Sequence, residues 1–465
     1  MKAEKILSIQ NYRTILLLII LPLVWALSGC KKDFLDKKPS KGLLVPTSES
    51  DFDALLDNNQ IFNIGPELNE IASGDLYITN DGWLSLQTPQ EQNAYIFADD
   101  VYSGQSFINE WNIPYQQVFY ANVVLDGLNQ LKTGLNSIEY NRIKGTALFQ
   151  RAFAFYNLVQ LFSKPYNIAS SLTDPGIPLR LKSDVNLKSV RGTVNQTYNQ
   201  ILTDLNTARS LLPMNSKFKS RPSQPAADAL LARVYLSMSD YTNAEIFADS
   251  CLAHYTKLYD YNTLDSSSYS PFPQVLPDNG DEVIFYARLS GYSFEVNSNT
   301  FVDSALYKSY KTNDLRRVIF YTDNGSGMFN YKGTYEGNSY YFGGLATDEI
   351  YFIRAECLAR KGRADLAMNE LNTVLLPKWK TGTFVRFTTS DASVALNLVL
   401  QERRKELIAR GLRWTDLRRL NNDPNFQVTI KHVINGKAHL LVPGDKHYTF
   451  PIPDYEIKTS GIPQN

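Results

Sequence analysis

The sequence predicts a mostly α-helical protein in which helical pairs form a curved scaffold that carries long loop-rich insertions and a few short β-hairpins. Three observations support this fold class. Apolar residues recur at helical spacing in several stretches, small residues occupy matched places in paired helices, and residues typical of turns dominate the long segments between the pairs.

The N-terminus predicts an export signal followed by a lipid anchor. An apolar stretch from Ile15 to Leu27 follows basic residues and is too short for a comfortable membrane span. It leads into Leu-Ser-Gly-Cys, which resembles the lipobox of bacterial lipoproteins, where the thiol of the cysteine (here Cys30) accepts a diacylglycerol. We expect residues 1–29 to be removed as a signal peptide and residues 30–48 to form the lipidated cysteine and its tether. An uncleaved anchor helix is the alternative.

The segment after the tether predicts one short helix and then a turn-rich region. Residues 49–58 are typical of a helix with Ser48 as its N-cap. Residues 61–110 lack a sustained helical period and are punctuated by turn residues. Helix packing does not account for all the aromatic rings here, so this is the first place to expect a ligand surface. The rings of this region belong to Tyr77, Trp83, Tyr95, Phe97, Tyr102, Phe107 and Trp111.

Helical pairs begin after this region. Residues 146–162 carry one continuous apolar stripe, which Pro165 ends. A second pair turns at residues 239–240 and a third at residues 361–362, both with small residues that let antiparallel helices approach closely. This layout resembles the tetratricopeptide repeat. Because long insertions separate the degenerate repeats, we expect about four pairs in a curved spine.

The largest insertion spans residues 260–345. Proline, glycine and serine turns divide it, and residues 282–286 are typical of a strand. Loops on a rigid scaffold often carry binding residues, and aromatic side chains concentrate here again. They belong to Tyr269, Phe272, Tyr292, Phe294, Tyr331, Tyr335, Tyr340, Tyr341 and Phe342.

The composition limits the classes of function. The chain has 47 basic and 47 acidic side chains, so it has no net field that would attract nucleic acid. It has 28 Tyr and 4 His, which suits stacking on neutral ligands better than metal or acid–base chemistry. Without a zinc-spaced cysteine cluster, we expect no metal and no cofactor. For Cys251 and Cys357, free buried thiols are favoured over a disulfide.

Several motifs, in order along the chain, resemble those of the SusD/RagB family. The strongest lies at residues 401–419, where Gln-Glu-Arg-Arg-Lys-Glu-Leu precedes Gly-Leu-Arg-Trp-Thr-Asp-Leu-Arg-Arg. Tyr-Phe-Ile-Arg-Ala-Glu at 351–356 and Tyr-Thr-Phe-Pro-Ile-Pro at 448–453 also match. The resemblance covers the mature chain. It implies one domain over residues 49–465, with an N-terminal part at about 49–260 and a C-terminal part at about 261–465.

The resemblance implies a nutrient-binding lipoprotein anchored in the outer membrane at the bacterial cell surface. Such a protein captures a polymeric nutrient, a glycan oligosaccharide in most relatives, and delivers it to a SusC-like TonB-dependent transporter. A RagB-like protein would capture peptides instead. No catalytic residue is implied. A surface hydrolase is disfavoured because GxSxG, HExxH and a phosphate-binding glycine loop are absent, and a tetratricopeptide adaptor because the insertions would fill its groove.

The expected ligand-binding residues come from the two aromatic segments. Ring faces would stack on sugar rings while polar neighbours bond the hydroxyl groups, and packing is the alternative role for each residue. Tryptophans on one flat platform would favour a glycan, and a wider groove a peptide. The candidates are Trp83, Trp111, Tyr77 and Tyr102, with Asp75, Asn80 and Asp81 as polar partners, and Tyr292, Tyr340 and Tyr341 as a second cluster.

The charged stretch near the C-terminus has a structural interpretation. Glu402 and Glu406 have the spacing of an acid–base pair, but the arginines beside them favour a salt-bridge network. Glu406 and Arg410 are spaced for an ion pair one helical turn apart. Trp414 is expected to pack back onto the helices, and residues 451–453 to form an extended strap.

Overall fold

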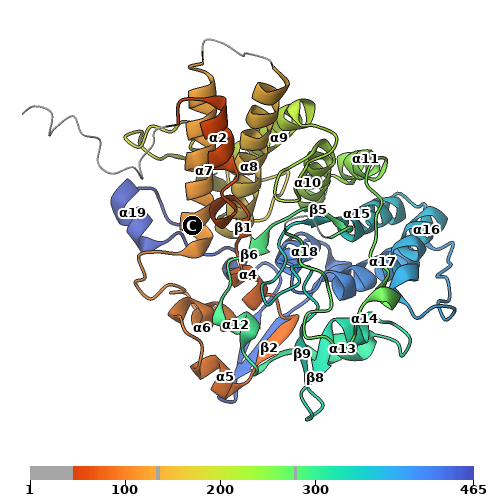
Figure 1. Ribbon diagram of the computed structural model, residues 1–465. Coiled ribbons are helices and arrows are strands. Elements are labelled where there is room, and N and C mark those ends of the chain that lie inside the picture. The colour runs from red at the N-terminus through yellow and green to blue at the C-terminus, as the bar shows by residue number, and fades with distance from the viewer. Residues whose placement is uncertain (1–45, 132–136, 277–279) are drawn as a thin grey trace, which may run out of the picture. The chain divides into compact units, whose positions relative to one another are not determined.

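The apolar stripes of the sequence form a series of scaffold helices, and from α7 to α17 each helix of this series packs on the next one in it, with α11 followed by α15 (Figure 1). The structure is a computed structural model that describes residues 46–131, 137–276 and 280–465. Residues Ser48–Asn465 form one compact unit. The scaffold helices are α7 (Asn109–Leu128), α8 (Ile138–Phe162), α9 (Val194–Leu211), α10 (Gln224–Ser237), α11 (Tyr241–Leu252), α15 (Thr347–Arg360), α16 (Ala364–Leu375), α17 (Ala392–Glu406) and α18 (Leu412–Leu420).

The second and third helical pairs are confirmed as α10–α11 and α15–α16. Ser239 has a φ of 59° in the first turn and Gly362 a φ of 78° in the second, where glycine adopts this conformation without steric cost. Ala248 and Ala367 are fully buried, which lets the paired helices lie close together. The pairs also pack on each other through α11 and α15. The prediction of a mostly helical, repeat-like fold is therefore correct.

Helix α8 lies at the centre of the core, between α7 and α9. The rings of Phe149 and Phe153 lie 4.8 and 5.7 Å from that of Phe285 in the insertion. The helix begins earlier than the apolar stripe indicates, because Tyr140 and Ile143 in its first turns pack in a second core cluster.

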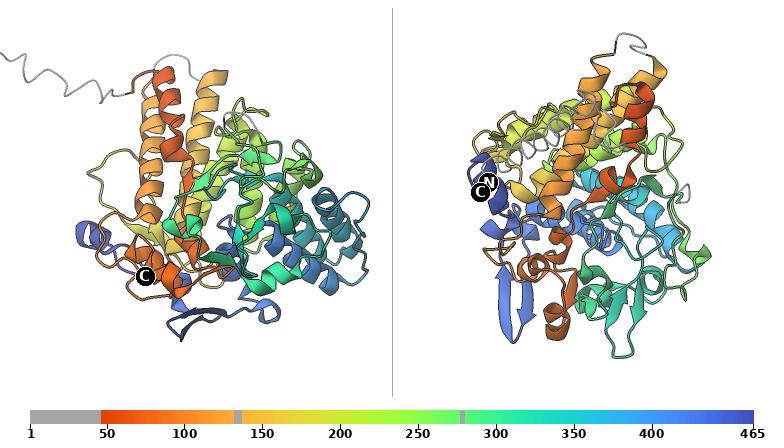
Figure 2. Two further views of the ribbon diagram at one scale, coloured as in Figure 1. Left: turned by 60° about the horizontal axis from the view of Figure 1, so that its bottom comes forward. Right: turned by 60° about the vertical axis from the view of Figure 1, so that its left-hand side comes forward.

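That second cluster is built around α2 (Glu49–Leu56), whose predicted cap is confirmed. The Ser48 hydroxyl accepts a hydrogen bond from the Asp51 amide at 3.3 Å, and the Asp51 carboxylate accepts one from the Ser48 amide at 3.0 Å. Phe52 packs against α7, where a Cβ at Gly127 would overlap its ring. In both views of Figure 2, α2 stands beside α7 and α8.

Short elements fill the segments between the scaffold helices. Two strand pairs, β1–β6 and β2–β7, join the turn-rich segment to the large insertion. The strand pairs are β1 (Ile64–Gly65) with β6 (Arg288–Leu289), β2 (Leu76–Ile78) with β7 (Thr300–Val302), β3 (Pro175–Pro178) with β4 (Arg191–Thr193), β5 (Val283–Phe285) with β10 (Leu345–Ala346), β8 (Tyr321–Asp323) with β9 (Phe329–Tyr331) and β11 (Ile430–Ile434) with β12 (Lys437–Leu441). The short helices are α3 (Asn59–Phe62), α4 (Leu68–Ile71), α5 (Asn80–Leu84), α6 (Pro89–Tyr95), α12 (Ser293–Val296), α13 (Ser304–Ser309), α14 (Arg316–Ile319) and α19 (Asp454–Ser460).

A buried salt-bridge network ties α17 to the insertion, as expected of Glu402 and Glu406. Their arginine partner is Arg316, however, and the neighbouring Arg403 and Arg404 pair with Asp416 and Asp75 instead. The guanidinium of Arg316 lies 2.5 Å from Glu402 and 3.2 Å from Glu406. The predicted Glu406–Arg410 ion pair is wrong, since Arg410 binds Asp348 at 2.7 Å instead. The reason is that α17 ends at Glu406, so Arg410 does not lie one turn further along the same helix.

The C-terminal segment closes the fold as a strap. The Phe450 amide donates to the Leu161 carbonyl at 2.8 Å, and Trp414 is buried with its ring 5.5 Å from that of Phe450. Cys251 and Cys357 are confirmed as free and buried. Among the helices of the described residues, none has the length and apolar character that a membrane crossing requires. Cys30 lies outside the described residues.

Candidate functional site

Half of the candidate binding residues are buried, with at most 6% of each side chain exposed: Trp111, Tyr102, Asp75, Tyr292 and Tyr341. A ring in the interior cannot present its face to a large ligand, so the structure assigns these side chains to packing. Trp111 packs edge-on against Phe162 at 4.9 Å, and its edge borders a small cavity of about 210 Å³.

The other four have equally specific interior partners. The Tyr102 hydroxyl donates to the Pro451 carbonyl at 2.8 Å, and the Tyr292 hydroxyl to Glu110 at 2.9 Å. The Asp75 carboxylate accepts a hydrogen bond from Arg404 at 2.7 Å. The ring of Tyr341 meets that of Tyr331 edge to face at 5.6 Å.

The five remaining candidates reach the surface around two short helices, and we call this region the α5–α12 surface: Tyr77, Asn80, Asp81, Trp83 and Tyr340. It combines both aromatic segments of the sequence. The Gln87 amide, after α5, donates to the Ser293 hydroxyl of α12 at 3.0 Å. A Cβ at Gly291, before α12, would lie 2.6 Å from the ring of Tyr340. The two segments are therefore in direct contact.

Helix α5 is held in place by its cap and by one glycine. The Thr79 hydroxyl accepts a hydrogen bond from the Gly82 amide at 3.2 Å. A Cβ at Gly82 would lie 2.6 Å from both Ile78 and Asn299, so glycine is needed for this close approach. Asn80 also contacts the β11–β12 hairpin, because its side-chain oxygen accepts the Asn435 amide at 2.8 Å.

Trp83 is half-buried and held by a pair of hydrogen bonds. Its indole nitrogen donates to the Gln92 carbonyl at 3.0 Å, and the Gln92 side chain donates back to the Trp83 carbonyl at 3.0 Å. These bonds fix the ring orientation before any ligand arrives. Leu84 beside it is 61% exposed and Val296 of α12 is 56% exposed, which adds apolar area to the same surface.

Buried or partly buried acids lie on α12 and beside it. Glu91 accepts hydrogen bonds from the Ser293 hydroxyl at 2.6 Å and the Phe294 amide at 3.0 Å. Burial raises the pKa of Glu295 to about 8. It raises the pKa of Glu67, which accepts the Gly291 amide at 2.6 Å, well above its usual range. Burial thus favours the neutral forms of Glu67 and Glu295.

Tyr340 has a charged neighbour that the sequence does not indicate. The Arg288 guanidinium lies 4.3 Å from the centre of its ring, at cation–π distance. Tyr340 is 39% exposed, so one part of the ring stays open. No sequence motif surrounds Arg288. It lies beside Tyr340 because of the β1–β6 pairing and the fold of the insertion.

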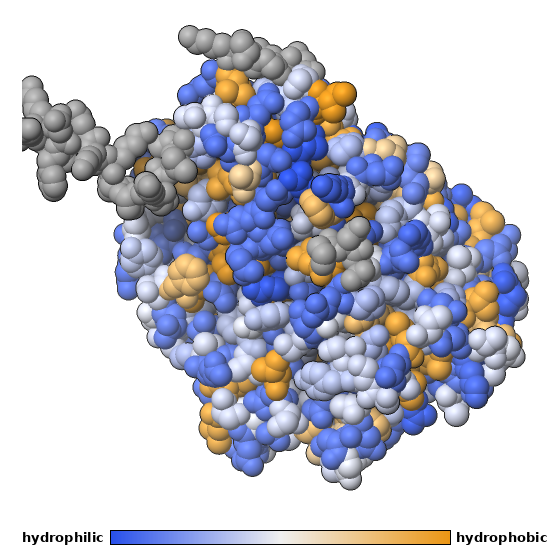
Figure 3. All heavy atoms as spheres, in the orientation of Figure 1, coloured by the Kyte–Doolittle hydropathy of each residue, from blue (hydrophilic) through white to orange (hydrophobic). Residues whose placement is uncertain are grey.

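The α5–α12 surface can stack on a ligand and bond its polar groups. Ring edges and faces come from Trp83, Tyr77 and Tyr340, and amide or carboxylate groups from Asn80, Asp81 and Asn297. On the face shown in Figure 3, hydrophobic residues are scattered among hydrophilic ones. Trp83 and Trp111 do not form one flat platform, because Trp111 is buried, so this criterion for a glycan ligand is not met.

One group of carboxylates has the spacing of a metal site. The side chains of Glu282, Asp348 and Glu406 lie with ligand oxygens within 4.8 Å of one another in the interior. The ammonium group of Lys378 lies 2.9 Å from Glu282 and 3.3 Å from Glu406. A cation from the chain itself therefore occupies the place that a metal ion would take.

The geometry is that of a helical scaffold with insertions that leave several aromatic rings at the surface. Two family models match the chain: one described as "Starch-binding associating with outer membrane" over residues 33–236, and one described as "SusD family" over residues 334–465. The chain belongs to the SusD/RagB family. Members of this family are binding proteins associated with the outer membrane.

Known relatives agree with this assignment. SusD-like protein P2 of Formosa agariphila is 27% identical over 247 residues, which cover 50% of this chain; the chain spans 45% of that protein's length. A SusD superfamily protein from Bacteroides fragilis has a TM-score of 0.72 at 20% identity, covering 90% of this chain and 99% of that chain. A structure described as a laminarin binding SusD-like protein has a TM-score of 0.65 at 19% identity, covering 89% and 97%. At these identities the structural likeness shows the fold.

Proposed function

We propose that this protein binds glycan oligosaccharides at the bacterial cell surface and delivers them to a SusC-like TonB-dependent transporter. The observation that carries the proposal is the α5–α12 surface, where a fixed indole and two tyrosine rings stand beside amide and carboxylate groups. Stacking on the apolar face of a sugar and bonding of its hydroxyl groups need this combination. No chemical step on the ligand is part of the proposal.

The family and its relatives support the proposed ligand class and the kind of partner. One family model is described as starch-binding, and one solved neighbour as laminarin binding. We therefore propose β- or α-linked glucans as the first ligands to test. Lipid attachment at Cys30 would hold the protein in the outer membrane beside its transporter.

Affinity electrophoresis in gels that contain laminarin or starch tests the binding site. Wild-type protein should be retarded in one of them, and Trp83→Ala should bind about tenfold more weakly, the effect of losing about 1.4 kcal/mol of stacking. Tyr455→Ala is the matched control, since Tyr455 is 59% exposed on α19, outside this surface. Circular dichroism should be unchanged in both variants.

Two outcomes would contradict the proposal. Equal retardation of wild type and Trp83→Ala would remove the α5–α12 surface from glycan binding. Binding of peptides with no retardation by any glycan would favour the RagB-like alternative. Co-purification of the transporter with the affinity-tagged protein from solubilised membranes tests the partner.

A further inference from the structure

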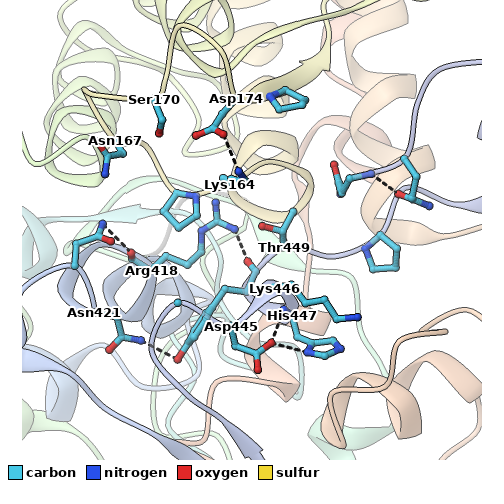
Figure 4. A pocket seen from close by; sticks show the side chains of 18 of the residues that line it. Lys164, Asn167, Ser170, Asp174, Arg418, Asn421, Asp445, Lys446, His447 and Thr449 are labelled. Atoms are coloured by element: carbon cyan, nitrogen blue, oxygen red, sulfur yellow. Dashed lines mark hydrogen bonds and ion pairs between the residues drawn. The ribbon is translucent and has the colours of Figure 1, made fainter.

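A cavity of about 580 Å³ lies away from the α5–α12 surface, between the loop that follows α8 and the C-terminal segment. Figure 4 shows Lys164 and Asp174 on one side and Asp445 and His447 on the other, with Arg418 between them. Its volume is in the range of small-molecule sites. None of the residues that line it belongs to the proposed glycan surface.

Arg418 is a buried cation at this cavity. Its side chain donates to the Tyr448 carbonyl at 2.5 Å and the Ser163 carbonyl at 2.6 Å, and 3% of the residue is exposed. Within the described part of the chain, no carboxylate lies within ion-pair distance of it, and its Nε has no hydrogen-bond partner. Burial lowers the pKa of this guanidinium to about 10.

The next residue shows how the same side chain is normally accommodated in this fold. Arg419 is equally buried but forms a two-pronged ion pair with Glu356 at 2.6 and 2.7 Å, and a further one with Asp416 at 2.8 Å. Buried charges are usually paired in this way, because the loss of hydration is otherwise uncompensated. Arg418 therefore departs from this rule, since it has no anionic partner among the residues that the structure describes.

A second arginine lines the same cavity, although it is only partly buried. Arg191 donates to the carbonyls of Gly176 at 2.8 Å and Pro463 at 3.0 Å, and to the Asn465 side chain at 2.7 Å. It too forms no ion pair with a described residue. A guanidinium has five N–H donors. Arg418 uses two of them, and Arg191 uses four because it also donates to the Pro175 carbonyl at 3.4 Å, so some donors remain for a ligand.

The acids at the cavity are already engaged. Asp174 pairs with Lys164 at 2.8 Å, Asp99 with Lys446, and Asp445 accepts His447 at 2.6 Å. These carboxylates can still accept hydrogen bonds from hydroxyl groups, and they would repel a doubly charged anion. The ring of Tyr448 packs on Trp414 at 5.1 Å and is buried, so it offers no open face for sugar stacking.

We propose that this cavity is a second ligand site, which binds a singly charged hydroxy acid such as a sugar acid, with Arg418 and Arg191 at the carboxylate. The guanidinium fork matches a carboxylate in geometry and charge. The hydroxyl groups of the ligand would face Asp445 and Asp174. This proposal does not depend on glycan binding at the α5–α12 surface.

Isothermal titration with sodium D-glucuronate tests the site, with D-glucose as the neutral counterpart of the same shape. Glucuronate should bind with a Kd below about 10 mM, and glucose and inorganic phosphate at least about tenfold more weakly. Arg418→Met should weaken glucuronate binding at least about tenfold. Arg363→Met is the matched control and should leave it unchanged, since Arg363 lies at the start of α16 and pairs there with Glu245.

Because Arg418 also holds two carbonyl groups, Arg418→Met could fail to fold. Arg191→Met then decides, with an expected loss of at least about threefold in affinity and a circular-dichroism spectrum like that of wild type. Competition by acetate distinguishes two sources of the ligand carboxylate. If acetate displaces glucuronate at equal concentration, the site binds free small acids. If acetate does not displace it, the site binds a sugar acid. The proposal is overturned if glucose binds as tightly as glucuronate, if glucuronate does not bind, or if folded arginine variants bind it as wild type does.

Discussion

Lys378 shows at the residue scale how this protein stabilises a buried charge. Its ammonium group is fully buried between Glu282 and Glu406, and the hydroxyl of Tyr335 lies 3.4 Å away. The nearby carboxylates raise its pKa although burial opposes this. Such a buried site holds a cation in one position and excludes water. The lysine therefore links the insertion to α17 as an internal counter-ion.

Removal of this cation should be strongly destabilising. Lys378→Met leaves the buried Glu282 without its cation and removes one of the two cations beside Glu406, so we expect a loss of about 3–5 kcal/mol in the free energy of unfolding. Urea titration at pH 7 measures the change. Lys257→Met is the control, because Lys257 pairs with Asp281 at the surface and should cost less than about 1 kcal/mol. Equal losses in the two variants would show that the buried network contributes nothing beyond a surface pair.

Glu70 gives a prediction for pH. Burial and the neighbouring Asp75 raise its pKa from 4.5 to about 8, although its carboxylate accepts the Gly411 amide at 2.9 Å. Between these two pH values the folded protein binds more protons than the unfolded chain, so this group makes stability fall as pH rises. Its contribution is fully present below pH 4.5 and lost above about 8.

Glu70→Gln should remove that slope while keeping an acceptor for the Gly411 amide. Melting temperatures measured from pH 5 to 8 should fall less in the variant than in wild type, where this group contributes up to about 1.4 kcal/mol per pH unit. The variant should be at least as stable as wild type at pH 8. Parallel curves for the two proteins would show that Glu70 is ionised in the fold.

At the scale of elements, α5 depends on a close approach more than on its own helix propensity. It has five residues, so its position is set by contacts with β2 and the loop before β7. Trp83 is on this helix, and the orientation of its ring follows from where α5 docks. A shift of α5 would move the ring without unfolding the scaffold.

Gly82→Ala tests this dependence. The added methyl group would meet Ile78 and Asn299, and overpacking of this kind costs about 1–3 kcal/mol. We expect a lower melting temperature and weaker retardation in glycan-containing gels. Gly65→Ala is the matched control, since a Cβ there would meet its nearest neighbours at an ordinary 3.7 Å. If a destabilised Gly82→Ala protein bound glycan as wild type does, glycan binding would not depend on the docking of α5.

At the scale of the whole molecule, the family of the protein and its proposed lipid anchor both concern its location in the cell. The family is associated with the outer membrane, and the proposed lipid anchor at Cys30 precedes the compact unit that begins at Ser48. A triacylated cysteine would hold the binding domain at the membrane without a spanning helix.

Cys30→Ser should abolish this attachment. The variant should keep its precursor size, incorporate no labelled palmitate, and lose cell-surface labelling with antibody. The purified full-length variant should bind glycan as wild type does, because the anchor is not part of the α5–α12 surface. Palmitate incorporation by the Cys30→Ser protein would place the lipid on another residue.

The sequence by itself determined the helical pairs, the cap at Ser48, the strand at β5 and the family. Each depends on residues close together in the chain, such as the alternating small and large residues of α10 and α11. It also located both aromatic segments. The tertiary structure decided which of their rings are exposed, and which charges pair with Glu406.

The physical reason is that burial depends on partners distant in sequence. Tyr102 is buried because it bonds Pro451, 349 residues later, and Tyr292 because it bonds Glu110. Trp83 remains half open because its partner, Gln92, is local and binds only its nitrogen edge. No local sequence pattern distinguishes the exposed rings from the buried ones. The β1–β6 and β2–β7 pairs bring the two aromatic segments together, and this contact decides which rings a ligand can reach.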